Sequence, residues 1–217
     1  ASKPITNSIA ARYLGRRSII DLSGIDQLRF HPRCYYRPAE DDVPGVREAW
    51  PAMIAAVTDN EGTITGVHRT WLDPQSHDKA AVAYPRRAMG HLLGSGVRFG
   101  KADGVMVAGE GLETLLSLRQ VMPSMAMIAG LSAAHLAAIQ LPAALRCLYV
   151  ARDDDPAGAA ALSTLAERCD PLGIAVLPLE PRLDDFNSDL TAYGHERLAA
   201  AIRVQLSAAD AVQFLKV

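Results

Sequence analysis

Acidic side chains follow two apolar stretches of this 217-residue chain, each at a point where a buried strand is expected to end. The first stretch closes in Gly109-Glu110-Gly111, and the second, residues 146–151, leads into Asp153-Asp154-Asp155. In an open parallel sheet, ligands bind beyond the carboxyl ends of the strands. If these two strands are neighbours, Glu110 meets Asp153 and Asp155 there. Converging carboxylates repel one another and need a cation, and oxygen ligands suit Mg²⁺ or Mn²⁺.

Simpler explanations exist for the same acids. A single acid after a strand is often a solvated loop residue, and acids at the start of a helix interact favourably with its dipole. One acid would serve that purpose, whereas three in succession repel one another unless they are neutralised. A calcium-binding EF-hand loop is excluded, because its twelfth position would be Thr164 instead of a glutamate.

Bulk composition limits the classes of protein that fit. Apolar residues make up 49% of the chain, enough for a sizeable core, and the net charge of −2 gives no overall basic field for nucleic acid. Any such contact must come from a local patch. The cysteines Cys34, Cys147 and Cys169 lack the spacing of a zinc site or a disulfide scaffold, so a reducing cytoplasm is expected. No signal peptide and no membrane-spanning apolar run is found.

The second half of the sequence alternates between strand and helix patterns. Strands are predicted near 105–109, 125–129, 146–151 and 173–178, and helices near 112–121, 132–140, 157–169 and 189–205. This alternation indicates βαβ units and a parallel sheet. Ser132 is expected to cap the second of these helices, and Asp155 followed by Pro156 opens the third.

The first half has a different pattern. A short helix is predicted within residues 1–20, and the proline-containing stretch 21–50 is predicted to be rich in loops. Residues 52–58 and 63–72 form a predicted hairpin, with Gly62 supplying a positive φ in the turn. Residues 80–101 give no clear element. Their basic side chains form either a solvated face or a phosphate-contacting patch, and they are Arg86, Arg87, Arg98 and Lys101.

Three segments together resemble the Toprim domain, which type IA and type II topoisomerases, bacterial primases, OLD-type nucleases and recombination mediator proteins share. They are Gly109-Glu110-Gly111, Gly130-Leu131-Ser132-Ala133 and the run from Asp153 to Ala160. The family has a glutamate after its first strand and Asp-x-Asp after a later one. The resemblance covers about residues 103–190 and implies that Glu110, Asp153 and Asp155 bind magnesium, with the glutamate acting as general acid or base.

Two further resemblances point to primases within this family. Asp185, in Asp184-Asp185-Phe186-Asn187, resembles an acidic motif at the end of primase Toprim domains, although it also suits the cap of the last helix. The predicted hairpin, ending in Arg69 and followed by Lys79, resembles the segment that precedes the Toprim part in replicative primases. Arg69 and Lys79 would then line a template and nucleotide groove together with Arg86 and Arg87. An exposed cation at a strand end is the alternative for Arg69.

The sequence therefore predicts an α/β protein, most similar to the primase-like Toprim proteins of plasmids, phages and integrated elements. Residues 1–101 would form an α+β subdomain, and residues 102–217 a Toprim domain with a C-terminal helix. The resemblance implies a DNA primase that makes RNA primers on single-stranded DNA from nucleoside triphosphates. A metal-dependent nuclease and a non-catalytic DNA-binding module are the alternatives. A replicative helicase partner and an upstream zinc-binding module stay open.

Overall fold

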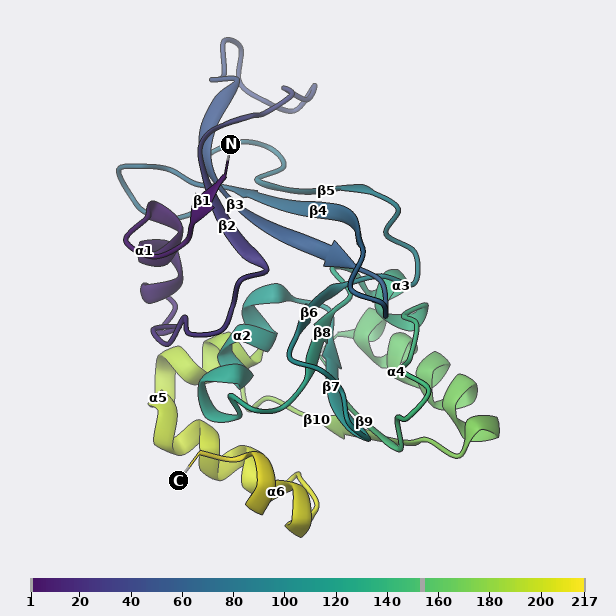
Figure 1. Cartoon of the computed structure of the whole chain (residues 1–217). Coiled ribbons are helices and arrows are strands. Elements are labelled where there is room, and N and C mark those ends of the chain that lie inside the picture. The colour runs from purple at the N-terminus through teal and green to yellow at the C-terminus, as the bar shows by residue number, and fades with distance from the viewer. Residues whose placement is uncertain (1, 153–154, 217) are drawn as a thin grey trace. The chain divides into compact units, whose positions relative to one another are not determined.

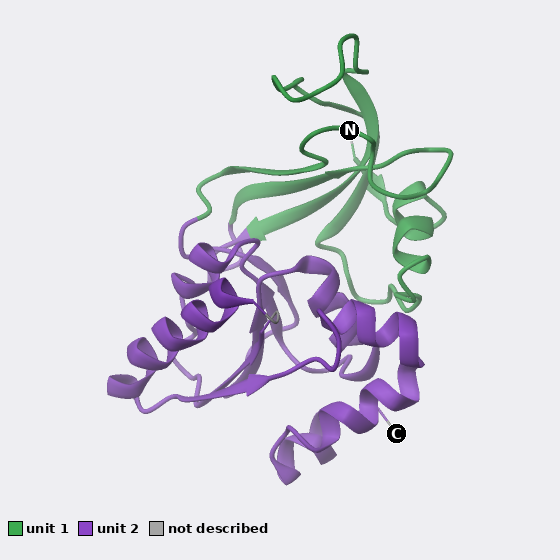
Figure 2. Cartoon of the chain, turned by 180° about the vertical axis from the view of Figure 1, so that it is seen from behind, with its two compact units in different colours: residues 1–57, 64–92 green, residues 58–63, 93–217 purple. Residues whose placement is uncertain are grey.

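The computed structural model describes residues 2–152 and 155–216, which form two compact units (Figure 2). The first unit comprises the residues up to 57 together with 64–92, and the second comprises 58–63 and the residues from 93 onward. This division differs from the expected boundary between residues 101 and 102. The difference arises because the strand β6 (Val97–Phe99) pairs within the sheet of the second unit.

The first unit consists of an antiparallel sheet and one short helix, which lies between the first two strands in the sequence. Its strands lie in the order β1-β2-β3-β4-β5. Gly62, between β3 and β4, has a φ of 82°, as the predicted hairpin turn requires. The helix α1 starts after Ser8, whose side chain accepts from the N–H of Ala11. The elements are β1 (Lys3–Pro4), α1 (Ile9–Gly15), β2 (Leu28–Tyr35), β3 (Ala49–Thr58), β4 (Ile64–Trp71) and β5 (Arg86–Gly90).

Strand β2 lies within residues 21–50, which were predicted to be rich in loops, and residues 21–27 and 36–48 on either side of it are in neither a helix nor a strand. The stretch looked irregular because Pro32 cannot donate to a strand ladder. The structure accommodates it with an irregularity, since the register of β2 against β3 shifts between His31 and Cys34. Strand β5 falls within residues 80–101, for which no element was predicted.

The second unit is built on a mostly parallel sheet in the order β10-β9-β7-β8-β6 (Figure 1). Only β6 runs antiparallel to its neighbour among the described strands of this sheet. Within the described ranges, none of the helices is both long and apolar enough to cross a membrane. The remaining strands are β7 (Val105–Gly109), β8 (Met127–Ala129), β9 (Cys147–Ala151) and β10 (Ala175–Leu179). The helices are α2 (Leu112–Val121), α3 (Ala133–Ala137), α4 (Pro156–Cys169), η1 (Asp170–Leu172), α5 (Phe186–Arg203) and α6 (Ala208–Phe214).

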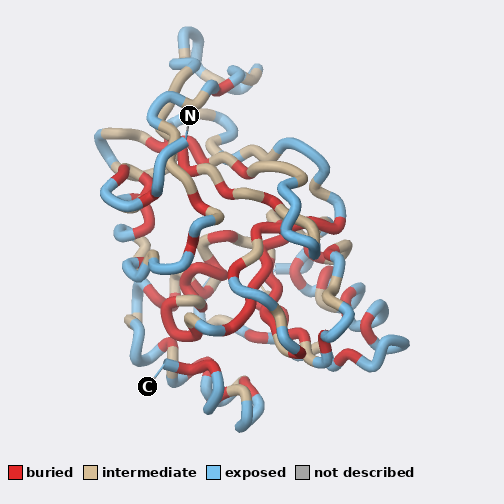
Figure 3. Tube along the Cα trace, viewed as in Figure 1, coloured by how far each residue is buried: buried red, intermediate tan, exposed pale blue. Residues whose placement is uncertain are grey.

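Helices cover both faces of this sheet, with α3 and α4 on one side and α2 and α5 on the other (Figure 1). The central strands β7, β8 and β9 are therefore buried along most of their length (Figure 3), which explains their continuous apolar runs, whereas the edge strand β10 is mostly exposed. On the α3 and α4 side, Ala108, Ile128 and Val150 are fully buried and belong to one core cluster with Leu165.

The tip of the β3–β4 hairpin belongs to the second unit. Thr58 and Gly96 exchange backbone hydrogen bonds of 2.9 and 3.1 Å, and the side-chain amide of Asn60 donates to the carbonyl of Leu141 at 3.2 Å. The guanidinium of Arg98 lies in the field of Asp59 and Glu61. The strands of one hairpin thus lie in one unit while its turn is bonded within the other.

Tyr149 on β9 fastens the start of α6 to the sheet. Its hydroxyl donates to Asp210 Oδ2 at 2.7 Å and accepts from the N–H of Ser207 at 2.9 Å. Burial is the main cause that raises the pKa of Tyr149 to about 12, and the hydrogen bond to Asp210 adds to it.

The raised pKa of Tyr149 predicts a loss of stability at high pH. In the unfolded chain the phenol ionises near pH 10.0, whereas the folded protein keeps the proton up to about 12. This contribution is fully present below pH 10.0 and is lost as the pH rises through 12. Urea unfolding across this range should show a falling free energy of unfolding. The decline should be shallower in Tyr149→Phe, and an equal decline in both proteins would contradict the prediction.

Candidate functional site

Strands β7 and β9 are parallel neighbours, and their register decides where the acidic residues lie. Gly109 at the end of β7 pairs with Ala151 at the end of β9. Glu110 follows one strand, and the loop that contains Asp155 follows the other, so both emerge at the same edge of the sheet. The condition on which the predicted cluster depends, that these two strands are adjacent, is confirmed.

Glycines around Glu110 are required by close packing. A Cβ on Gly109 would lie 2.8 Å from Leu115 Cδ2 and 3.2 Å from the Cβ of Ala151, and one on Gly111 would lie 2.8 Å from Thr114 Oγ1. Such distances are too short for ordinary carbon contacts. The glycines therefore let β7 turn directly into α2 while staying against β9, which leaves Glu110 as the side chain of this turn.

The loop after β8 is bonded to the backbone of the same turn. The N–H of Gly130 donates to the carbonyl of Gly109, and the N–H of Leu131 donates to that of Glu110, both at 2.9 Å. Leu131 has a positive φ of 73°, a conformation that costs a leucine energy. Ser132 then caps α3, as predicted, and its Oγ lies 2.8 Å from Nδ1 of His135. The position of Glu110 is thus fixed by two neighbouring strands.

Two of the predicted metal-binding acids act as helix caps. Asp155 Oδ1 accepts from the N–H of Gly158 at 2.6 Å, and Asp185 Oδ1 accepts from the N–H of Ser188, also at 2.6 Å. Asp155 and Asp185 therefore both act as helix N-caps, and in each the oxygen Oδ1 accepts the capping hydrogen bond. Asp153 lies outside the described residues.

Carboxylate oxygens, such as those at this edge of the sheet, are the kind of ligand that a hard divalent cation prefers. Among the residues that the structure describes, however, no group of three histidine, cysteine, aspartate or glutamate side chains is arranged to hold a metal ion. Glu110, Asp155 and Asp185 do not form such a group by themselves. A third carboxylate at the ends of β7 and β9 would have to come from residues 153 and 154, which lie outside the described residues. Oxygen donors of this kind fit Mg²⁺ or Mn²⁺ better than a softer metal.

Sequence reasoning missed two charged residues at the same edge, Arg152 and Glu180. Leu179 at the end of β10 pairs with Ala151, so Glu180 emerges beside Arg152 just as Arg152 emerges beside Glu110. Arg152 Nη2 lies 3.3 Å from Glu180 Oε1. A usable signal existed, since each is the first charged residue after an apolar strand. Recognising them as neighbours needs the register of strands that are distant in sequence.

Two of the predicted nucleic-acid-binding residues face each other in the sheet of the first unit. Arg69 on β4 pairs with Arg87 on β5, and like charges placed directly opposite are destabilising. The guanidinium of Arg69 lies 4.9 Å from the ring centroid of Trp71, and that of Arg87 lies 4.5 Å from the ring of Tyr36. These cation–π contacts offset part of the repulsion. Arg69 Nε is buried and makes no hydrogen bond.

Arg87 is tied into its own unit, whereas Arg86 is exposed. Arg87 donates to the carbonyl of Arg37 at 2.7 Å and to the hydroxyl of Tyr36 at 3.0 Å. That hydroxyl in turn donates to Asp42 at 2.7 Å. Lys79 sits in a short bridge with Leu72. The four predicted basic residues thus differ in kind, and the contacts of Arg87 are those of a structural residue.

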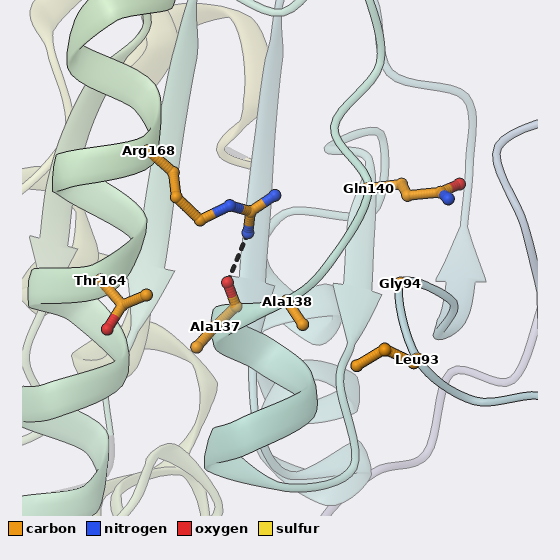
Figure 4. Close-up of a pocket in the computed structure, with 7 residues that line it drawn as sticks. All are labelled: Leu93, Gly94, Ala137, Ala138, Gln140, Thr164 and Arg168. Carbon is orange, nitrogen blue, oxygen red and sulfur yellow. Dashed lines mark hydrogen bonds between the residues drawn. The ribbon is translucent and has the colours of Figure 1, made fainter.

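A shallow cavity in the second unit is not the acidic site. It has a volume of about 530 Å³ and is lined by Leu93, Gly94, Ala137, Ala138, Gln140, Thr164 and Arg168 (Figure 4). The guanidinium of Arg168 donates to the carbonyl of Ala137, the last residue of α3, and to that of Ile139 just beyond it. Since α4 starts at the carboxyl edge of the sheet, its residues 164 and 168 lie toward the opposite edge. The cavity wall is mostly apolar and has no carboxylate.

Comparisons with known proteins agree with this geometry. Residues 105–196, which include both strand ends and Asp185, match the Toprim domain family. The chain carries a Toprim domain. Residues 1–99 match a second family, described as a domain of unknown function (DUF7146). A search of the curated proteins found no match.

Several solved structures that share this fold are primase fragments. The Aquifex aeolicus primase, with its zinc-binding and RNA polymerase domains, aligns with a TM-score of 0.57 at 18% identity over 94% of this chain and 57% of its own. The primase fragment of the bacteriophage T7 primase-helicase aligns at 0.51 and 16% identity, over 89% of this chain and 69% of its own.

The RNA polymerase domain of the Mycobacterium tuberculosis primase DnaG, solved with a double-stranded DNA that has a 6-nucleotide overhang, aligns at 0.51 and 14% identity over 92% of this chain and 74% of its own. At these identities the likeness shows a shared, primase-like Toprim fold. This chain spans a little over half of the Aquifex fragment.

Replacing Gly130 should destabilise the protein. A Cβ there would lie 2.7 Å from the backbone nitrogen and Cα of Leu136, so α3 would have to move. Gly130→Ala should lower the free energy of unfolding by about 1–3 kcal/mol, measured by urea denaturation. Gly15→Ala is the matched control, because its added Cβ meets nothing within 4 Å. Equal stability of the two variants would contradict the packing argument.

Adjacent arginines on β5 should respond differently to removal. Arg87→Ala breaks cation–π contacts with Tyr36, Trp71 and Tyr84 and two hydrogen bonds from a charged donor, and should cost about 2–4 kcal/mol of stability. Arg86→Ala should stay within about 0.5 kcal/mol of the parent protein, since its side chain is exposed. Thermal unfolding monitored by circular dichroism measures both. A destabilised Arg86 variant beside a stable Arg87 variant would refute the distinction.

Proposed function

We propose that this chain is the catalytic core of a DNA primase, a nucleotidyltransferase that makes RNA primers on single-stranded DNA. The observation that supports this most directly is the pairing of Gly109 with Ala151, which brings Glu110 and the loop of Asp155 to one edge of the sheet. Converging acids at that place fit the joining of a nucleotide to a growing strand, because this reaction moves highly charged phosphates. The shared fold with primase fragments is consistent with the proposal.

In this proposal Glu110, Asp153 and Asp155 hold one or two magnesium ions, with Asp185 as a further ligand. The metal ions would lower the pKa of the attacking 3′-hydroxyl and stabilise the leaving pyrophosphate. The chain's own contribution is to fix the donors. Glu110 is positioned by bonds from the loop after β8, and Asp155 by its cap of α4. Glu110 would also act as general acid or base.

Basic residues of the first unit would bind the nucleic acid. Arg69, Lys79, Arg86 and Arg87 carry the charge that phosphates require in a chain whose net charge is −2. The exposed Arg86 suits direct contact with a phosphate. Arg87, whose guanidinium is already bonded, would contribute mainly its field. Single-stranded DNA and nucleoside triphosphates are the proposed partners, and a replicative helicase is a further one.

Removing an acid from either strand end should abolish primer synthesis. Glu110→Gln and Asp153→Asn remove charge with little change in side-chain size, so the fold should be kept. Incorporation of labelled nucleotide on a single-stranded template should fall on the order of 100-fold or more in each. Binding of Mn²⁺, followed by its paramagnetic resonance signal, should weaken in parallel. Asp170→Asn, in η1 beyond the far end of α4, is the matched control and should behave like the parent.

The outcomes separate the proposal from its alternatives. Retained synthesis in both acid variants would refute the assignment of the site. Nicking of plasmid DNA without primer synthesis would contradict the primase proposal and assign the same carboxylates to a nuclease. A parent protein that binds no divalent ion at millimolar concentration would indicate a non-catalytic DNA-binding module.

A further inference from the structure

Each of the two described sheets ends in two edge strands, and most of these are protected against pairing with a further strand. Strand β1 is two residues long and contains Pro4, and β6 is only three residues long. In β10 the N–H of Ala175 and the carbonyl of Leu179 both bond toward β9, so the alternate residue Pro178 lies on the outer edge. Short strands and a proline that offers no N–H donor are common ways to block an exposed edge.

The remaining edge strand, β5, lies beside β4 and has neither form of protection (Figure 1). At its two ends the carbonyl of Pro85 and the N–H of His91 bond to β4. Because backbone groups of an antiparallel strand alternate in direction, Arg86 and Ala88 turn their N–H and C=O groups away from β4. Within the described ranges, no segment on the outer side of β5 bonds to these groups.

The open edge is basic. Residues 79–92 contain Lys79, Arg86 and Arg87 and no acidic residue. The carboxylate of Asp42 lies in the field of Arg87 and compensates part of its charge. The exposed side chain of Arg86 makes no hydrogen bond and no ion pair in the part of the chain that the structure describes. Charged side chains on an edge repel a strand of like charge, but they attract one of opposite charge.

We infer that β5 is the docking edge for an extended acidic segment of a partner protein, which joins the first sheet as an additional strand. The outward backbone groups of Arg86 and Ala88 would bond to the segment, and its carboxylates would lie opposite the arginine side chains. The inference goes beyond the proposed function, which assigns only the side chains of Arg86 and Arg87 to DNA.

The backbone of β5 decides between this partner and other occupants. Nucleic acid suits the arginine side chains, but its phosphate oxygens are acceptors only and cannot satisfy both the N–H and the C=O groups of a strand edge. A second copy of this chain would bring another basic edge to the first, and like charges across a strand pair are destabilising. An acidic peptide strand matches both the hydrogen-bonding pattern and the charge.

A synthetic peptide of alternating glutamate and valine with blocked ends is the probe, and a peptide of alternating lysine and valine is its control. The whole chain should bind the acidic peptide at least about tenfold more tightly than the basic one, measured by fluorescence anisotropy. Hydrogen exchange followed by NMR locates the contact. The amide protons of Arg86 and Ala88 should become protected on binding, whereas those of Arg87 and Met89 should be protected with and without the peptide.

Proline substitutions at adjacent residues test the direction of the edge. Ala88→Pro removes an N–H that faces away from β4, so it should keep the thermal stability of the parent and lower the affinity for the acidic peptide on the order of tenfold or more. Met89→Pro removes an N–H that faces β4 and should lower the melting temperature. Arg86→Glu leaves the backbone intact, and it should weaken binding of the acidic peptide and strengthen that of the basic one even if Ala88→Pro does not fold.

Several results would overturn the inference. Binding that leaves the exchange of Arg86 and Ala88 unchanged, and is equal in Ala88→Pro, would indicate attraction by charge alone. An acidic peptide that binds no more tightly than the basic one would exclude an acidic strand. A dimer that sedimentation detects without peptide, and that Ala88→Pro dissociates, would assign β5 to a second copy.

Protection of the same amides by a single-stranded oligonucleotide would assign the edge to nucleic acid and would also overturn the inference. None of these measurements involves primer synthesis or a metal ion. A failure of this inference is therefore distinguishable from a failure of the proposed function.

Discussion

The parallel pairing of β7 with β9 is the constraint on which the rest of the second unit depends. It is possible only because Gly109 has no side chain where Leu115 and Ala151 approach it. The pairing places the ends of both strands side by side, so the loops that follow them leave the sheet at the same edge. Burial of both faces under helices holds this pairing in place, since a shift of β9 by one residue would exchange the side chains packed on its two faces, Leu148 and Val150 on one and Tyr149 and Ala151 on the other.

Much of the second unit could be predicted because its sequence is locally consistent. The strand at 105–109 and the helix at 112–121 have the predicted bounds, and β9 and α4 differ from their predictions by one residue at the start. Strong apolar runs and caps such as Ser132 and Asp155 carry that information within a few residues. The first unit was harder, because β2 contains Pro32 and pairs irregularly, and because β5 is mostly exposed and therefore lacks an apolar pattern.

Some residues of the candidate site can be recognised from the local sequence, whereas others become neighbours only through the pairing of distant strands. Glu110 and the aspartate loop are visible in sequence as acids after apolar strands. The neighbours Arg152 and Glu180 are not, because only the register between separate βαβ units brings them together. Arg87 shows what a local sequence pattern leaves out. Its basic side chain suggests a nucleic-acid contact, yet Tyr36 and the carbonyl of Arg37 already occupy it.

The bonded hairpin tip has a consequence for how such chains can be recombined. Thr58 and Asn60 belong to a stretch that the second unit holds through Gly96 and Leu141, although the strands on either side of it lie in the first. A fragment that begins near residue 92 would therefore lack the turn that bonds to Gly96 and Leu141 in the whole chain. A chimaera that exchanges the first part with that of a relative would import a foreign turn, which would have to form these bonds to Gly96 and Leu141 in its place.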